Sequence, residues 1–98
     1  MLEKMTSSGS RDPFAWYGLA LEYRTLGRLD DALRTFHTLR EIDPGYVAAY
    51  LMAAQTSKMA ARLDDAREWV QAGIACAKAK GDGHALSELE SFAAEVGP

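Results

Sequence analysis

Apolar residues recur every three or four positions along most of the chain, and glycine, proline and aspartate interrupt the pattern at intervals. The first such stretch, residues 13–26, is apolar at most positions and follows an aspartate–proline pair. This spacing is that of an α-helix with a wide apolar face. Asp12 and Pro13 suit the N-cap and the first helical turn. We therefore predict a helix over 13–26 that ends at Gly27.

Further stretches with the same spacing follow, separated by short polar breaks. The second begins at Asp30 or Asp31 and ends at Asp43-Pro44-Gly45, because the residue before a proline disfavours helical backbone. The third and fourth cover about 46–60 and 64–80. After Gly81-Asp82-Gly83, a last stretch carries an apolar stripe of Leu86, Leu89, Phe92, Ala93 and Val96. Five helices and no strand are predicted, so the fold class is all-α.

The segment Arg28-Leu29-Asp30-Asp31-Ala32 recurs as Arg62-Leu63-Asp64-Asp65-Ala66, at an offset of 34 residues. Across one full period, seven of 34 positions are identical. A fixed period of this length indicates stacked helical units. The repeated aspartate pairs are therefore expected to act as caps or dipole partners at helix N-termini, rather than as acid–base or Ca²⁺-binding groups.

The first period resembles a tetratricopeptide repeat, the helix–turn–helix unit of an α-solenoid. The residues that carry the resemblance are Trp16, Leu19, Ala20, Tyr23, Gly27, Ala32, Phe36 and Pro44. The second period is a degenerate copy, with Ser57 in the slot of Tyr23 and Lys78 in the slot of the closing proline. We expect the fourth helix to continue to Lys80 for that reason.

The resemblance implies an α-solenoid of two such repeats followed by a capping helix. The expected organisation is an N-terminal tail over 1–11 and a single domain over 12–98. Within this domain, the first repeat covers 12–45, the second covers 46–80 and the capping helix covers 83–96. A strict period of 34 would bury Ser87 and Glu88, so the register of the last helix is expected to slip.

Charge and composition narrow the classes of partner. The chain has 11 basic and 14 acidic residues, a net charge of −3, and residues 82–98 contain four acidic residues with no lysine or arginine. This balance disfavours nucleic-acid binding, including that of the related pentatricopeptide family. No apolar run approaches the ~18 residues of a membrane span, and the first ten residues lack the apolar core of a secretory signal. The lone cysteine fits a reducing compartment, so a cytoplasmic location is expected.

No set of residues predicts catalysis, and we expect neither enzymatic activity, nor a cofactor, nor a metal site. Cys76 falls one period after Ile42 and is expected to be a buried structural thiol. His37 is expected on the solvent side of its helix, and His84 at a helix start. Trp69 either packs under the last helix, which we favour, or protrudes as a contact residue.

In the repeat family, ligands lie against the first helix of each pair, on the concave face. The residues that would face this groove are Phe14, Tyr17, Leu21, Arg24, Leu51, Met52, Gln55, Lys58 and Met59. Several are apolar or aromatic, which is typical of interface centres. Alternatively, the last helix or the N-terminal tail covers some of them, with Leu2 and Met5 as candidates for docking on an apolar groove.

Some chaperone-binding members hold a peptide's terminal carboxylate with lysine, asparagine and arginine. The corresponding positions here are Tyr17, Leu21 and Met52, which disfavours a carboxylate-clamp ligand and favours an apolar or helical segment. The leading hypothesis is a non-enzymatic protein-interaction module that acts as a scaffold or adaptor. The alternative is a homodimer whose groove or open edge is occupied by its own copy.

Overall fold

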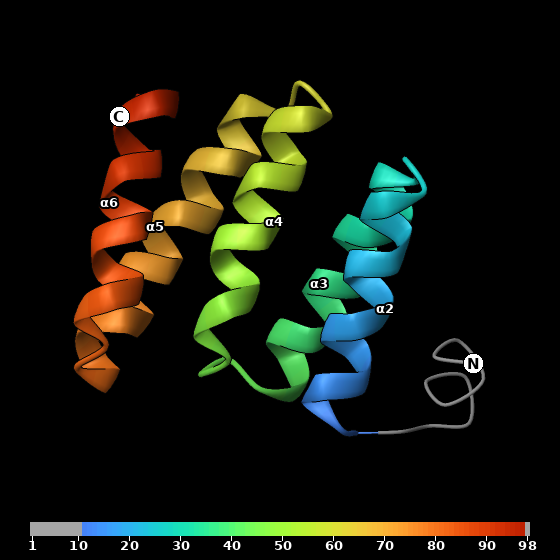
Figure 1. Ribbon diagram of the computed structural model, residues 1–98, viewed down its shortest axis with the longest axis horizontal. Helices are drawn as coiled ribbons and strands as arrows, with labels where there is room; N and C mark the ends of the chain where they lie inside the picture. Colours follow the sequence, from blue (N-terminus) through green and yellow to red (C-terminus); the bar gives the residue numbers. More distant parts are fainter. Residues whose placement is uncertain (1–10, 98) are drawn as a thin grey trace.

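The computed structural model describes residues 11–97, and these residues form helices without strands (Figure 1). The described helices are α2 (Pro13–Thr25), α3 (Leu29–Ile42), α4 (Val47–Met59), α5 (Leu63–Lys80) and α6 (Gly83–Val96). The all-α prediction and its five helices are confirmed, with several ends that differ from the predicted ones by one or two residues. The expected docking of Leu2 and Met5 lies outside the described residues.

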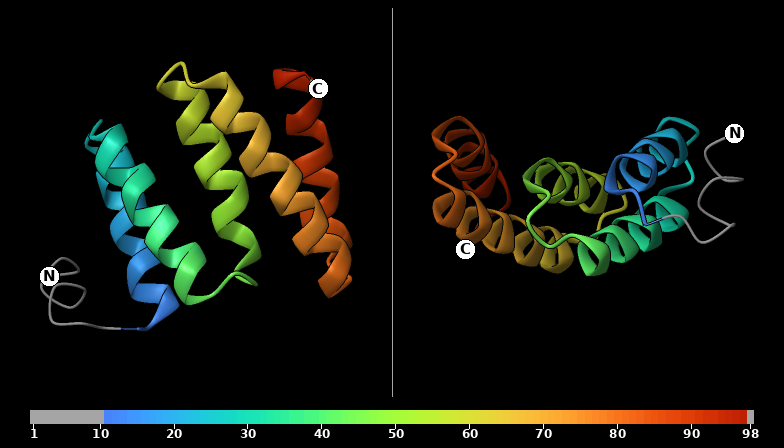
Figure 2. Two further views of the ribbon diagram at one scale, coloured as in Figure 1. Left: turned by 180° about the vertical axis from the view of Figure 1, so that it is seen from behind. Right: turned by 90° about the horizontal axis from the view of Figure 1, so that it is seen from below.

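The helices form two layers. Each helix packs against the next one along the chain, and α4 also contacts α2 and α6. In the right-hand view of Figure 2, α2, α4 and α6 form one row and α3 and α5 form the other. The rows curve, and the first row lies on the concave side. This arrangement is the predicted stack of two helix–turn–helix repeats followed by one further helix.

The chain breaks that the sequence predicted have the expected chemistry. The Asp12 side chain accepts a hydrogen bond from the Phe14 backbone N–H at 3.0 Å, which caps α2. Gly27 and Gly81 follow α2 and α5 with φ of +78° and +68°, a backbone conformation that glycine adopts without steric cost. The Asp82 side chain caps α6 by accepting from the Ala85 N–H at 3.1 Å.

The two aspartate pairs do not cap their helices. Helix α3 begins at Leu29, ahead of the predicted start, and its N-cap Arg28 makes no side-chain capping bond. Asp30 and Asp31 instead lie in the first turn, where carboxylates interact favourably with the helix dipole. Asp31 pairs with Arg28 at 2.7 Å, and Asp30 pairs with Arg62 at the start of α5.

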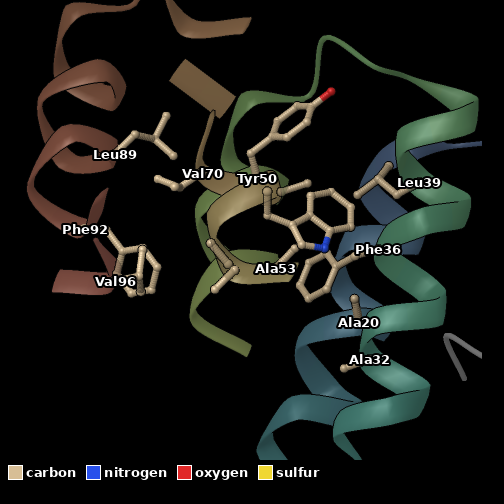
Figure 3. Packing of buried hydrophobic residues seen from close by; sticks show 14 of the residues in the cluster. Ala20, Ala32, Phe36, Leu39, Tyr50, Ala53, Val70, Leu89, Phe92 and Val96 are labelled. Atoms are coloured by element: carbon tan, nitrogen blue, oxygen red, sulfur yellow. The ribbon is translucent and has the colours of Figure 1, made fainter. Parts of the chain in front are cut away.

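Small residues allow the helices of the first repeat to approach closely. Ala20 of α2 and Ala32 of α3 are completely buried, and Phe36 fills the space beside them. Figure 3 shows Ala20 and Ala32 where α2 and α3 face each other, the Phe36 ring on the side toward Ala53, and Leu89 and Phe92 contributed from α6. The core is therefore continuous across both repeats and the last helix, as stacking of units that cannot bury their own faces requires.

Trp69 of α5 lies in a different place from the one that we expected. Its side chain is 1% exposed, and its ring lies against residues of α3 and α4. Its ring centroid lies 4.8 Å from that of His37 and 5.8 Å from that of Tyr50. The Arg40 guanidinium lies over the indole at 5.0 Å, and Arg40 also forms a two-bonded ion pair with Glu68 at 3.0 and 3.1 Å. Trp69 thus joins α5 to α3.

Cys76 is only partly buried, which corrects the expected core position. Its sulfur lies 3.6 Å from the Pro44 carbonyl oxygen. The side chain therefore packs at the edge of the core, against the turn between α3 and α4. The turn keeps one side of the thiol covered and leaves the other in contact with solvent.

Candidate functional site

The concave side of the molecule contains an open groove of about 310 Å³ between α2, α4 and α6. Helices α2, α4 and α6 supply its walls, and these helices contribute aromatic, apolar and acidic side chains. The residues that line it are Tyr17, Val47, Ala48, Leu51, Met52, Asp82, His84, Ala85, Glu88 and Leu89. A second hollow of about 290 Å³ follows, with Leu51, His84 and Glu88 common to both.

The floor of the groove is apolar. Leu51 and Met52 of α4 are partly buried and pack on the core, while Ala48, one turn earlier, is exposed. Tyr17 of α2 forms the adjacent wall, with its ring centroid 5.1 Å from that of Tyr46. Helical spacing places positions 48, 51 and 52 on one face of α4, so the groove runs along the helix axis.

The opposite wall comes from α6 and is acidic. Asp82 and Glu88 line the groove, and Glu88 Oε1 lies 3.4 Å from His84 Nε2, one turn earlier. The second hollow continues along α6 past Phe92 to Glu95. An apolar floor therefore meets a wall on which Asp82, Glu88 and Glu95 are the charged acidic groups.

The far end of the groove is closed by polar contacts between helices. Arg24 of α2 donates to Gln55 Oε1 at 3.3 Å and approaches Met52 Sδ at 3.6 Å. The Arg24 Nε atom is buried without a hydrogen-bond partner among the described residues. Lys58 pairs with Glu95 at 3.0 Å, which joins α4 to α6.

Burial raises the pKa of Tyr17 above its ordinary value, charge repulsion with the Tyr46 phenolate adds to the effect, and Arg24 partly opposes it. The pKa of Tyr46 is also raised, first by burial and then by the negative charges of Asp12 and Asp43. Both hydroxyls are therefore neutral hydrogen-bonding groups near neutral pH.

The structure brings together only part of the residue set that the sequence suggested. Tyr17, Leu51 and Met52 line the main groove and Gln55 lines its continuation. Leu21 packs on the core, and Arg24 and Lys58 form the interhelical contacts described above. Phe14 and Met59 line neither hollow and are 70% and 54% exposed.

Sequence reasoning missed the wall from α6. The repeat frame assigns groove positions by their place in the period, and α6 departs from that frame. Leu89, Phe92 and Val96 are buried where a strict period would have buried Ser87 and Glu88. The apolar stripe of α6 gave the signal for this shift, because the residues between its members must face outward.

No group of three or more histidine, cysteine, aspartate or glutamate side chains that could hold a metal ion occurs within residues 11–97. The groove offers an apolar floor, the Tyr17 ring and carboxylates.

A family model described as tetratricopeptide repeat matches residues 23–88, which is more than half of the chain. The chain belongs to the tetratricopeptide repeat (TPR) family. It is similar to a TPR repeat-containing protein of Pseudomonas aeruginosa, with 30% identity over 91 residues that cover 93% of this chain and 87% of that protein.

Solved structures agree with this assignment. The TPR domain protein from Salinibacter ruber has a solution structure similar to this one, with a TM-score of 0.82, 34% identity and coverage of 87% of this chain and 86% of that one. A Bordetella parapertussis protein matches with a TM-score of 0.83, 25% identity and coverage of 97% and 83%. SycD, the type III secretion translocator chaperone of Yersinia enterocolitica, has the same fold at 14% identity, with a TM-score of 0.87 and coverage of 97% and 66%.

Helical-repeat folds present extended concave surfaces to their partners. The TPR fold of this chain therefore suggests a protein–protein interaction module.

Within residues 11–97, no helix combines the length and the apolar character that a membrane crossing requires.

Proposed function

We propose that this TPR protein is a non-enzymatic, cytoplasmic interaction module that binds an apolar or helical segment of a partner protein in its concave groove. The observation that carries the proposal is the apolar floor of Leu51, Met52 and Ala48, which lies open between α2 and α6. Aromatic and methionine side chains at a concave surface are typical of the centre of a protein interface.

The size of the groove fits side chains and not a whole domain. Its two hollows, of about 310 and 290 Å³, share Leu51 and lie one after the other along α4. A peptide helix presents apolar side chains at intervals of three and four residues, so successive turns can place one anchor in each hollow. An extended segment with two spaced apolar residues satisfies the same geometry.

Ala48 offers a test that leaves the core intact, because it is exposed and lines the groove. A displayed random-peptide library is selected on the wild-type protein, and the enriched peptides are then measured against Ala48→Trp and Ala75→Trp. Ala75 is also an exposed helical alanine, but it lies on α5 outside the groove. We expect Ala48→Trp to abolish binding and Ala75→Trp to leave it unchanged. An absence of enriched peptides, or equal binding by both variants, would contradict the proposal.

Self-association is a second candidate, favoured by the open end of the stack. Helix α2 has no helix before it among the described residues, and its Phe14 and Leu26 side chains are 70% and 64% exposed. A second copy could cover this edge. Light scattering over a hundredfold range of concentration distinguishes a 10.7 kDa monomer from a dimer. If a dimer is found, Phe14→Glu should dissociate it, whereas Leu51→Glu should do so only if the groove itself is the interface.

A further inference from the structure

Three carboxylates lie near the N-termini of α4 and α6, at the end of the groove that we call the lower groove. None of them has a lysine or arginine ion-pair partner within residues 11–97. Asp82 and Glu88 line the main groove, and Asp43 lies next to it in a shallow hollow that also includes Asp82, Val47 and Ala48. Asp82 and Asp43 accept backbone N–H hydrogen bonds from Ala85 and Gly45 at 3.1 and 3.0 Å. Their charges are held in place and are not neutralised.

The basic residues nearby are already engaged. Lys80, which lines the hollow with Asp43, donates to the Gly45 carbonyl oxygen at 2.7 Å. Lys58 is paired with Glu95, and Arg24 is held by Gln55 at the far end of the groove. Most of the remaining ion pairs join residues within α3 or α5, or α3 to α5, on the convex layer. Lys80 keeps its positive charge, so three carboxylates against this one lysine leave a negative balance at the lower groove.

We propose that the groove selects a partner segment that carries lysine or arginine next to its apolar anchors, with the basic side chains placed against Asp82, Glu88 and Asp43. The inference rests on the proposed function and specifies the chemistry of the ligand for that same groove. Apolar side chains of the segment would lie on Leu51 and Met52, while its basic side chains would lie along the N-terminal half of α6. Complementary charge of this kind contributes selectivity and a faster association rate.

An apolar floor and negative charges along one wall act together on such a segment. Basic side chains reach such a wall with their aliphatic stems lying along apolar surface. A segment that carried glutamate at the same positions would bring like charges together at a partly desolvated site, which is unfavourable.

Two labelled model helices of about 15 residues test the choice of charge. Both have the same leucine stripe, and the remaining positions are lysine in one and glutamate in the other. Fluorescence anisotropy with the full chain should show that the lysine peptide binds at least about tenfold more tightly than the glutamate peptide. This preference should decrease as the ionic strength increases.

The matched variants are Glu88→Lys and Glu90→Lys. Both residues are exposed on α6 and both changes alter the net charge equally, but only Glu88 lines the groove. We expect Glu88→Lys to weaken binding of the lysine peptide by about fivefold or more, and Glu90→Lys to have a much smaller effect. Equal losses in the two variants would show non-specific attraction and would overturn the inference.

Ala48→Trp separates the failure of this inference from that of the proposed function. If the glutamate peptide binds as tightly as the lysine peptide and Ala48→Trp abolishes both, the groove binds peptides but the charge preference is wrong. If neither peptide binds, or if Ala48→Trp changes nothing, binding in the groove is itself contradicted and the charge preference falls with it.

Discussion

Gly73 of α5 stands directly against Leu89 of α6. A Cβ atom built at Gly73 would lie 2.8 Å from Leu89 Cδ2 and 2.6 Å from Tyr50 Cβ, both closer than side-chain atoms approach one another. In the first repeat the equivalent position is Leu39, a fully buried side chain. The second repeat therefore has no side chain at this position, and Leu89 of α6 and Tyr50 of α4 fill the space that a side chain would take.

Gly73→Ala should destabilise the protein although alanine is the better helix former by about 1 kcal/mol. Tyr50 Cβ is fixed to the backbone of α4 and cannot rotate away, so the helices must separate. We expect a net loss of about 1–3 kcal/mol in the free energy of unfolding, measured by urea denaturation.

Gly83→Ala is the matched control for that change. Gly83 begins α6, and a Cβ atom there would meet nothing within 4 Å. This substitution should leave stability unchanged or raise it slightly. A Gly73→Ala variant as stable as Gly83→Ala would show that the α4–α5–α6 packing is looser than described.

Ala61 has a backbone conformation that is costly for its residue type. Its φ is +61°, and it occupies the position that Gly27 holds one period earlier with φ of +78°. A left-handed backbone costs about 1–2 kcal/mol for a residue with a Cβ atom. Ala61→Gly should therefore raise the free energy of unfolding, by about 0.5–1 kcal/mol after the greater flexibility of glycine in the unfolded chain is subtracted.

The neighbouring residue tests whether this gain comes from the backbone. Ala60 has φ of −85°, a value that any residue adopts, so Ala60→Gly should lower stability. If the two substitutions move the midpoint of thermal unfolding in the same direction, strain at Ala61 is not the cause.

Trp69 contributes stability by filling the space between α3, α4 and α5. Trp69→Ala should cost about 3–5 kcal/mol, a large part of the ~5–15 kcal/mol stability of a domain. Trp69→Phe, which retains a ring against Tyr50, should cost less and give a measurable unfolding transition. His37→Ala removes only the partner ring and should cost about 0.5–1.5 kcal/mol. A loss at His37 as large as that at Trp69 would contradict this account.

Tyr50 should make stability depend on pH in alkaline solution. Burial raises its pKa, an effect that the nearby Arg40 partly opposes, and its hydroxyl donates to the Pro44 carbonyl oxygen at 2.6 Å. The folded state therefore keeps the proton at a pH where the unfolded chain loses it. The resulting stabilisation is complete below about pH 10, the ordinary tyrosine pKa, and is lost as pH rises through the higher folded value.

Tyr50→Phe isolates this contribution. At about pH 8 the variant should lose about 0.5–1.5 kcal/mol, since the hydrogen bond is absent. Between about pH 9 and 11 its stability should fall less steeply than that of the wild type in urea denaturation series. Parallel pH profiles for the two proteins would show that Tyr50 ionises equally in the folded and unfolded states.

Most helix boundaries could be read from local signals. These signals act within one or two turns of the chain. They are the Asp12–Pro13 cap, the glycines with positive φ and the replacement of a closing proline by Lys78. Their effect does not depend on what the helix later packs against. The start of α3 was misplaced because its first turn begins at Leu29, ahead of the aspartates that resembled a cap.

The groove was predictable only on two sides. Tyr17, Leu51 and Met52 follow from the repeat frame, since their place in the period sets their direction. The α6 wall of Asp82, His84 and Glu88 does not follow from that frame. Its position depends on how far α6 rotates when Leu89 packs against Gly73, which is a contact between residues 16 positions apart.

The periodic spacing of apolar residues and the capping chemistry were sufficient for the all-α repeat fold, because both act through the local geometry of a helix. The direction of Trp69, the partial exposure of Cys76 and the acidic wall of the groove depended on packing between helices. An apolar stripe indicates that one face of a helix is buried, but it does not indicate which neighbouring helix covers that face. The packing between helices decides this.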